Sequence, residues 1–576
     1  MHKKTLLILF LLTLLTYGNS LFNGFVGDDE VVILNNKFYQ DWKHFPQLFN
    51  KAKYLTRSKQ VYFNVDDDFG SGSVAYRPVL SATYFVDYAL WKTDPFGYHL
   101  NNLVLHLLNA VLVYFLLFFI LGKSDAALLG SLIFSVHPIQ TEAVCNVGYR
   151  ADSLAFFFLL SAFLAFIRYA KHEGTKRYLL YSGSLVFFWL ALFSKESAIV
   201  FPALILCYDF YIKKMSLAEM VRQAKSRYLG LIVIAIAHVY IYGFVFTNTS
   251  LQYVPQVSES FFIHIVKMCR IWVGYIIVLI FPAQVTILPP LYAPDAQPLW
   301  AIENIFAVLI VVFLALFTLK RVKHRSIISF FVLWFVISLI PVSGIIPLIN
   351  PVAYRFIYLP SVGFCAVLAI VLEKITIKRT WSQYFSDWKA LLVGTIIGAC
   401  MLITIIQNRL WHDNYMIAFE LIKNYPDQKQ GYVILGIEHF KNRLYDQAKP
   451  YLIQSLRLGS TDPRVYYRLG VCYMDQSPEA AEVFLKKAIE LQNDYAAPYI
   501  RLSDFYLRTR AYDRALPYLE KSVILSPHWA GNYVKLIQAY VALKRYDSAK
   551  SAFIRAKNEL QNPEQLQRLE QFFLSF

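Results

Sequence analysis

Three consecutive acidic residues, Asp28, Asp29 and Glu30, follow the first apolar run of the chain, residues 6–15. Neighbouring carboxylates repel one another, and the low dielectric of a membrane boundary strengthens this repulsion. A carboxylate held at such a boundary can act as a general base that takes a proton from an attacking hydroxyl group. Acidic residues are also common at solvated helix ends. Both interpretations fit these three residues alone, and the rest of the chain discriminates between them.

Three isolated basic residues, Arg150, Lys195 and Arg355, each stand beside an apolar run. A lone cation at a membrane boundary can simply extend its side chain to the lipid head groups. Three of them on the side that carries the acidic residues fit a site for an anion instead. Arginine suits phosphate in particular, because its planar guanidinium donates two parallel hydrogen bonds.

Further polar residues accompany these candidates. His99, Asn102, His106 and Asn109 recur at the spacing of one helix face. Polar groups within a membrane helix either face a wet cavity or form hydrogen bonds to neighbouring helices, and the spacing fits both. His137, Glu142 and Asp152 gather with Arg150 in one short loop, and the remaining candidates are Arg77 and Glu196.

The composition is that of a membrane protein. Hydrophobic residues make up 57% of the 576 residues, with 46 Phe and 40 Tyr, and the mean hydropathy is +0.42. The formal net charge of +17 would suggest a nucleic-acid partner in a soluble protein. Here much of the Lys and Arg lies in short loops between apolar runs, which indicates membrane topology. We therefore expect membrane lipids as partners and no nucleic acid.

The six cysteines are scattered, and no pair has the spacing of a zinc site or of a disulfide framework. We expect no structural metal from them.

A helix needs about 20 mostly apolar residues to cross a bilayer. Hydropathy predicts about 11 spans, and one further apolar stretch, 264–282, is ambiguous because it contains Lys267 and Arg270. The predicted spans are 4–21, 100–121, 125–137, 153–169, 178–194, 197–213, 228–247, 301–319, 326–346, 356–373 and 388–407.

The charges in the loops orient these spans. His2, Lys3 and Lys4 place the N-terminus in the cytoplasm, although a cleaved signal peptide is a competing interpretation. The basic clusters of later loops, such as 320–325, then also lie in the cytoplasm if 264–282 does not cross fully. An odd number of spans follows, with a long outer loop at 21–98 and the C-terminal domain outside.

The C-terminal part has an internal repeat of about 34 residues, the period of tetratricopeptide repeats. The pattern predicts about four repeats between residues 430 and 563. Recurring positions are Leu435, Leu469, Leu502 and Leu536, together with Ala448, Ala481, Ala515 and Ala549. We therefore expect an all-α chain, with a polytopic membrane bundle at 1–410 and a repeat solenoid at 411–576. The concave face of such a solenoid commonly holds a peptide.

The ordered motifs of residues 20–365 resemble those of the transmembrane and tetratricopeptide-repeat O-mannosyltransferases, a family of the GT-C superfamily of glycosyltransferases. Tyr354 stands before Arg355 where the family pattern has an acidic residue, and the shorter chain fits a bacterial or distant member. The matching motifs are Phe25-Val26-x-Asp28-Asp29 with Asn35-Asn36, Tyr76-Arg77-Pro78, His99-x-x-Asn102-x-x-x-His106, His137-Pro138-x-x-Thr141-Glu142-Ala143, Gly148-x-Arg150-Ala151-Asp152, Lys195-Glu196 and Tyr358-Leu359-Pro360-Ser361.

The resemblance implies transfer of a sugar, with mannose as one candidate, from a polyprenyl-phosphate-linked donor to a hydroxyl acceptor such as protein Ser or Thr. By the family pattern, Asp28 is the base, and Asp29 orients the acceptor or holds a metal. Arg150, Lys195 and Arg355 bind the phosphate. Relatives differ in metal dependence, so the resemblance leaves a divalent metal open.

The alternative is a non-enzymatic membrane scaffold or transporter that carries a peptide-binding repeat domain. Transporters usually place their charges near the middle of the bilayer, whereas the charges here flank the predicted spans, which favours an enzyme. The expected location is the bacterial inner membrane, or the endoplasmic reticulum in a eukaryote. The repeat domain would then lie in the periplasm or the lumen.

Overall fold

The computed structural model describes residues 2–34, 36–50, 76–242, 261–284, 301–322, 324–345, 352–374, 382–560 and 563–574. Within these ranges every regular element is helical, so the all-α prediction is confirmed. Asn35, from the Asn35-Asn36 pair of the first family motif, and residues 51–75 of the predicted outer loop lie outside the described ranges. The chain divides into two compact units, one ending at Asp413 and the other beginning at Asn414. The sequence places this division at 410.

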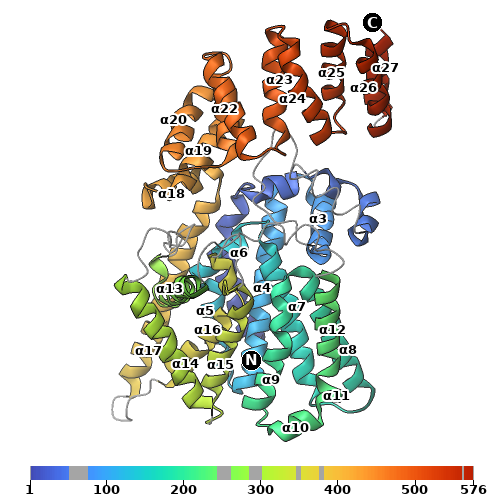
Figure 1. Cartoon of the computed structure of the whole chain (residues 1–576). Coiled ribbons are helices and arrows are strands. Elements are labelled where there is room, and N and C mark those ends of the chain that lie inside the picture. The colour runs from blue at the N-terminus through green and yellow to red at the C-terminus, as the bar shows by residue number, and fades with distance from the viewer. Residues whose placement is uncertain are drawn as a thin grey trace. The chain divides into compact units, whose positions relative to one another are not determined.

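The first unit is a bundle of apolar helices (Figure 1). Six stretches of the described residues are long and apolar enough to cross a membrane. They are Lys3–Phe22, Pro95–Leu121, Arg150–Tyr169, Gly174–Ser194, Phe262–Ile280 and Ala390–Trp411. In the same order, the helices concerned are α1 (His2–Tyr17) with η1 (Gly18–Phe22), α4 (Pro95–Leu121), α7 (Arg150–Tyr169), α8 (Gly174–Ser194), α13 (Phe261–Ile280) and α17 (Ser382–Asn408).

Shorter apolar helices complete the bundle, so the predicted count of about 11 spans is not confirmed. Four apolar stretches fall below the length of a full span: Ser124–Val136, Leu229–Tyr240, Ile302–Thr318 and Ile327–Val342. They belong to α5 (Ser124–Val136), α12 (Leu229–Tyr240), α14 (Ile302–Val322) and α15 (Ile327–Leu339). The predicted spans at 197–213 and 356–373 contain only α9 (Phe201–Tyr211) and α16 (Ser361–Lys374).

Helix α13 lies across one end of the bundle. In Figure 1 it is seen nearly end-on, whereas α14, α15 and α17 run lengthwise. Trp272 Nε1 donates to the carbonyl of Ser343 at 2.9 Å, and Tyr275 donates its hydroxyl hydrogen to the carbonyl of Ala353 at 3.2 Å. Both acceptors belong to the segments that follow α15. The length and composition of this helix would allow it to cross a membrane, so whether residues 264–282 span remains the open point of the predicted topology.

The end of α17 is tied to the end of α1. Asn408 Nδ2 donates to the carbonyl of Thr16 at 2.9 Å, and Asn23 Nδ2 donates to the carbonyl of Asn408 at 3.1 Å. Beyond α17, the carbonyl of His412 accepts a hydrogen bond from the backbone N–H of Gly24 at 2.9 Å. The last residues of the first unit therefore lie beside the turn that contains the acidic residues.

The second unit contains four consecutive helix pairs in the predicted region. Their shared leucines and alanines form its core: Leu435, Leu469, Leu502 and Leu536 are at most 4% exposed. The pairs are α19 (Lys429–Lys441) with α20 (Tyr445–Arg457), α21 (Pro463–Tyr473) with α22 (Pro478–Leu491), α23 (Ala496–Arg508) with α24 (Tyr512–Leu525), and α25 (Ala530–Ala542) with α26 (Tyr546–Glu559). Helices α18 (Asn414–Asn424) and α27 (Pro563–Leu574) flank them.

Candidate active site

The acidic turn begins at Gly27, whose φ of +55° is a conformation that a side chain would disfavour. Asp29 is fully buried. One of its carboxylate oxygens accepts a hydrogen bond from the backbone N–H of Gly148 at 2.5 Å, and the other accepts from Val147 at 3.3 Å and from Val26 at 3.2 Å. Asp29 therefore connects its own turn, through hydrogen bonds, to the loop that precedes α7.

Asp28 lies on the same loop with its side chain only half-buried. A Cβ atom at Gly148 would lie 3.8 Å from Asp28 Cβ and 2.9 Å from Asp29 Oδ1, so this close approach requires glycine. Burial raises the pKa of Asp29 to about 7; its backbone hydrogen bonds lower that pKa, and the charge of Asp28 raises it. Of the two acids, Asp28 is the one that solvent and a substrate can reach.

Arg150 does not lie open to a ligand. Its guanidinium donates to Asn102 Oδ1 at 2.5 Å, to Thr83 Oγ1 at 3.2 Å and to the carbonyl of Tyr98 at 3.2 Å, and it forms an ion pair with Asp87. These bonds use four of its five N–H groups. Its side chain is 3% exposed. Arg150 thus links α3 (Pro78–Trp91), α4 and α7 to one another.

Three other cations form ion pairs, each with a carboxylate from another part of the chain. Arg77 donates two hydrogen bonds to Glu196, 2.6 and 3.1 Å long, and the Lys195 ammonium lies 2.5 Å from the Asp152 carboxylate. Arg355 pairs with Glu142, which also accepts the backbone N–H of Arg355 at 3.0 Å. Among the described residues these bonds leave N–H groups of all three cations unused.

The three cations are close enough to influence one another. Burial and the guanidinium charges of Arg77 and Arg355 lower the pKa of Lys195, while Asp152 opposes this shift. Burial alone would raise the pKa of Glu196, but the charge of Arg77 and the hydrogen bonds from it hold that pKa at about 2. Glu196 is therefore ionised at neutral pH, and the cluster is a concentrated set of charges of both signs.

Tyr149 connects this cluster to the acidic turn. The guanidinium carbon of Arg355 lies 3.9 Å from the centre of the Tyr149 ring, within cation–π distance. Burial raises the pKa of the Tyr149 hydroxyl, and the charge of Asp28 raises it further. Tyr149 thus contacts Arg355 and responds to the charge of Asp28.

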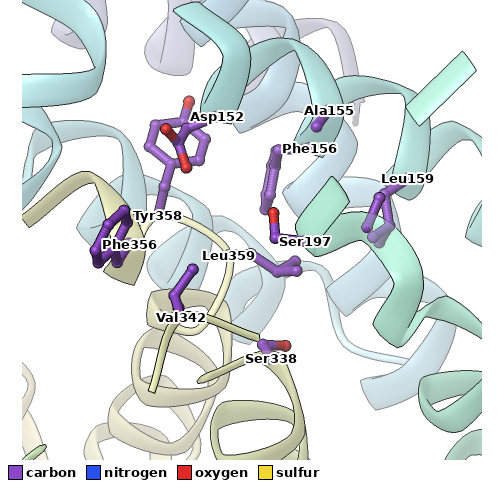
Figure 2. A pocket seen from close by; sticks show the side chains of 11 residues that line it. Asp152, Ala155, Phe156, Leu159, Ser197, Ser338, Val342, Phe356, Tyr358 and Leu359 are labelled. Atoms are coloured by element: carbon purple, nitrogen blue, oxygen red, sulfur yellow. The ribbon is translucent and has the colours of Figure 1, made fainter. Parts of the chain in front are cut away.

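An apolar pocket opens beside the Lys195–Asp152 pair (Figure 2). In this view Asp152 lies at one end of the pocket and Ser338 at the other. Lys195 Nζ stands 5.1 Å above the ring of Phe356, a lining residue. The lining is mostly aromatic and aliphatic: Ala155, Phe156, Leu159, Ala198, Val342, Phe356, Tyr358 and Leu359, with Asp152, Ser197 and Ser338 as its other residues.

The polar face of α4 makes hydrogen bonds between helices. His106 Nε2 lies 3.0 Å from the carbonyl of Ser135, which can only accept, so Nε2 carries the proton and Nδ1 accepts the Tyr358 hydroxyl at 2.7 Å. Asn109 Nδ2 donates to the same hydroxyl at 3.2 Å. These bonds fix the ring of Tyr358 in the pocket wall, so His106 and Asn109 position the site without contacting its open space.

Two other predicted histidines also form hydrogen bonds to backbone groups. His99 Nε2 lies 3.2 Å from the carbonyl of Gly24, which orients the acidic turn. His137 Nε2 donates to the carbonyl of Leu279 on α13 at 3.1 Å, and its Nδ1 accepts the backbone N–H of Ile139. Burial lowers the pKa of His137 to about 4, so this imidazole is neutral. These contacts agree with the supporting role at the site that we predict for both histidines.

The sequence analysis missed Asp87 and Tyr149. Asp87 is 2% exposed and lies in the helix that follows Tyr76-Arg77-Pro78. A single acid within an apolar helix needs a buried partner, and this signal could have pointed to Arg150. Nothing in the sequence marks Tyr149 beyond its place between Gly148 and Arg150. Among the described residues, no group of three His, Cys, Asp or Glu side chains is arranged to hold a metal.

Comparison with known proteins points to one family, although no family model matches the sequence. The chain is 26% identical over 385 residues to Protein O-mannosyl-transferase F38B6.6 of Caenorhabditis elegans, which covers 65% of the chain and 52% of that protein. It is 23% identical over 520 residues to human Protein O-mannosyl-transferase TMTC3, covering 81% and 53%. The identity to Xenopus laevis Protein O-mannosyl-transferase tmtc2 is 32% over 216 residues, covering 35% and 23%.

The chain spans about half the length of the first two of these relatives. One chain of the crystal structure of APC/C hetero-tetramer Cut9-Hcn1 aligns with 91% of this chain and 95% of its own length, at 14% identity. Its TM-score of 0.23 is too low to support an argument about the fold. The sequence relatives agree with the resemblance that the motifs predict: this chain is similar to the TMTC-family protein O-mannosyl-transferases.

Proposed function

We propose that the protein is a GT-C type glycosyltransferase that moves a hexose, mannose in the first instance, from a polyprenyl-phosphate donor to a hydroxyl group of a polypeptide. One observation carries the proposal. Arg77 and Arg355 act electrostatically on Lys195, which lies beside the pocket residues Asp152 and Phe356, and Arg355 lies over the ring of Tyr149, whose pKa the charge of the half-buried Asp28 raises. An apolar chain, a phosphate and a reacting hydroxyl each find a suitable environment in this arrangement.

The aromatic and aliphatic residues of this small pocket put hydrophobic surface beside Lys195, along which the first atoms of an isoprenoid chain would pass. The phosphate of the donor would then lie near Lys195. Cations at this point neutralise the negative charge that grows on the phosphate as the glycosidic bond breaks. Lys195 and Arg355 have unused N–H groups for this contact, whereas Arg150 has one at most. We therefore assign phosphate binding to Lys195, Arg355 and Arg77.

Asp28 is the proposed general base. In the transfer step, the acceptor oxygen forms a bond to the anomeric carbon, and the bond from that carbon to the phosphate oxygen breaks. The electron pair leaves with the phosphate, and the hydroxyl proton passes to Asp28. A lipid phosphate is stable as an anion, so the step needs no strong general acid. Asp29 holds the turn in place through three backbone N–H groups.

We further propose that the repeat domain lies on the same side of the membrane as Asp28, in the lumen or the periplasm. The chain leaves the membrane unit at Asp413, and His412 accepts a hydrogen bond from Gly24, four residues before Asp28. The charges of the loops support the same orientation. A repeat domain placed there could hold an acceptor polypeptide and raise its concentration at the site.

The test uses the purified full-length chain in detergent or liposomes, supplied with polyprenyl-phosphate mannose and a Ser- and Thr-containing protein. Mass spectrometry should find hexose on Ser or Thr with the wild-type chain and none with Asp28→Asn. A scaffold or transporter, the alternative function, would leave the acceptor unmodified while still binding protein or moving a solute. Wild-type chain that binds the lipid donor yet transfers no sugar to any hydroxyl acceptor would overturn the proposal.

A further inference from the structure

The end of α7 that is remote from the candidate active site carries a dense group of cations. Two stretches of the chain lie there, 168–177 and 213–227, and together they contain nine Lys and Arg residues and two acidic residues. The second stretch includes two short helices, α10 (Leu217–Arg222) and α11 (Ala224–Arg227), at the lower end of the bundle in Figure 1. We use the name basic rim for five exposed side chains of these stretches: Lys171, Arg177, Lys213, Arg222 and Lys225.

Contacts between helices bring the basic rim together. Tyr169, the last residue of α7, accepts a hydrogen bond from Arg177 of α8 at 3.3 Å. Its own hydroxyl donates to the carbonyl of Ser226 in α11 at 3.4 Å, next to Lys225. Lys171, just beyond α7, is close enough to act electrostatically on Lys213, just beyond α9. Cations from the ends of several helices therefore gather in one region.

The acidic residues packed into this region already have protein partners. Asp209 of α9 forms an ion pair with the buried Arg227 at 2.6 Å. Glu219 of α10 accepts hydrogen bonds from the backbone N–H and the hydroxyl of Ser216, at 2.7 and 3.0 Å, in a capping box. The basic rim thus keeps a net positive charge, and its exposed side chains can meet an anion from outside.

Helix α10 adds apolar side chains to this charged surface. Leu217 and Val221 are 69% and 75% exposed and stand four residues apart, on one face of the helix. Met220, between them, is buried against the bundle. Exposed apolar side chains continue along α12, which begins two residues after α11, with Leu229 and Val233. Helix α10 therefore lies where the apolar outer surface of the bundle ends and the cations begin.

The distance along α7 agrees with this place. The helix has 20 residues, so it spans about 30 Å. The hydrocarbon core of a bilayer has about the same thickness. When the acidic turn at the start of α7 lies at one surface of the membrane, the basic rim lies at the other.

We infer that α10 and the basic rim bind anionic phospholipid head groups at this second surface of the bilayer. A helix with apolar side chains on one face and cations beside them lies in the membrane interface, with its apolar side chains among the acyl chains. Leu217 and Val221 occupy that position, and the rim cations contact the lipid phosphates. The attraction of cations beside a membrane helix to anionic lipids supports the choice of head group. This site lies away from Asp28, so the inference does not depend on the proposed transfer reaction.

The test measures lipid binding by the purified full-length chain and needs no sugar donor. Native mass spectrometry counts the lipids that the protein retains from a mixture of equal amounts of phosphatidylglycerol and phosphatidylcholine with the same acyl chains. We expect at least about tenfold more bound phosphatidylglycerol, since one cation near an anionic leaflet is worth about fivefold in binding. Added salt should reduce this preference. Equal retention of the two lipids would overturn the inference.

Paired variants locate the binding surface. Arg222→Gln with Lys225→Gln should lose most of the preference for phosphatidylglycerol. The matched control, Arg514→Gln with Lys550→Gln, removes the same charge from exposed positions of the second unit and should keep the preference. Equal loss in both double variants would refute the assignment to the basic rim.

A fluorescent label reports the surroundings of α10. Val221→Cys, labelled on a chain that also carries Cys207→Ser, is placed in liposomes that contain phosphatidylglycerol. We expect quenching by lipids with brominated acyl chains and protection from acrylamide in the water. The same label at Lys550→Cys, in the second unit, is the control and should be quenched by acrylamide alone. Quenching of the Val221 label by acrylamide alone would show that α10 faces water and would leave the rim to a soluble acidic partner, which would overturn the inference.

Discussion

The Lys195 ammonium lies 2.5 Å from the Asp152 carboxylate, and the two side chains are 7% and 9% exposed. The pair joins the end of α8 to the first turn of α7 at the rim of the apolar pocket. A buried ion pair contributes little net stability, but removing one partner leaves an uncompensated charge. Asp152 therefore keeps the Lys195 ammonium beside the pocket, where hydrophobic surface alone would exclude a cation. In the proposed mechanism the lipid phosphate binds at this ammonium.

Lys195→Met should abolish or strongly reduce transfer. The ammonium contacts the leaving phosphate in the proposed mechanism, and a hydrogen bond to a charged group is worth about 1.5–3 kcal/mol. We expect a 10- to 100-fold loss in kcat/KM for the sugar donor. Steady-state transfer at varied donor concentration measures it.

The single substitution leaves Asp152 buried without its partner, which costs about 3–5 kcal/mol of stability. The double variant Lys195→Met with Asp152→Asn removes both charges and should recover the thermal unfolding midpoint without recovering transfer. Full activity of a well-folded double variant would contradict the assignment of Lys195 to the phosphate.

Arg150→Ala should act on folding and not on recognition of the sugar donor. Protein groups accept from four of the five N–H groups of its guanidinium, and the variant leaves Asp87 buried without its ion-pair partner, at a cost of about 3–5 kcal/mol. The double variant Arg150→Met with Asp87→Asn should regain much of that stability and show an unchanged KM for the donor. A folded double variant with a greatly raised KM would restore Arg150 to the phosphate site.

Hydropathy and the repeat period predicted the all-α class and the four helix pairs, because both are regular patterns that do not depend on distant contacts. The span count was less predictable: several apolar runs, such as 197–213, form short helices that begin or end in 3₁₀ turns. The sequence could not show which of the predicted site residues would be paired with one another. Arg150 and Lys195 look alike in sequence and both have a buried carboxylate partner, but Arg150 also donates to Asn102, Thr83 and the carbonyl of Tyr98, contacts that no sequence pattern shows.

Asp28→Asn should lower the transfer rate by roughly 10²–10⁴ and leave folding intact, because a general base contributes about this factor. The side chain is half-buried and keeps its size in the variant. Single-turnover transfer by purified protein measures the rate, and lipid-donor binding provides the control for a formed site. A variant that keeps more than about a tenth of the wild-type rate would rule Asp28 out as the base.

Asp29 should make folding stability depend on pH. Burial raises its pKa from 3.8 to about 7 in the folded chain. Between these values the folded state keeps a proton that the unfolded state has released, so stability falls as pH rises from about 4 to about 7, by at most about 1.4 kcal/mol per pH unit. The difference between wild type and Asp29→Asn in unfolding free energy should follow this slope. A difference that does not vary with pH would contradict a protonated Asp29.

The last prediction concerns which side of the membrane the repeat domain occupies. A cysteine placed at Lys550, an exposed position of α26, should react with a membrane-impermeant thiol reagent in sealed, right-side-out vesicles. A cysteine at Lys176, an exposed residue in the first turn of α8, should react only after permeabilisation, since the loop between α7 and α8 is predicted to be cytoplasmic. The native cysteines provide a low background, because five of the six are buried.

The opposite labelling pattern would place Asp28 on the cytoplasmic side as well, because His412 contacts Gly24 where the chain leaves the membrane unit. Labelling of both positions from the same side would instead show an even number of crossings between them, which would make α13 or one of the shorter apolar helices the element to reassign.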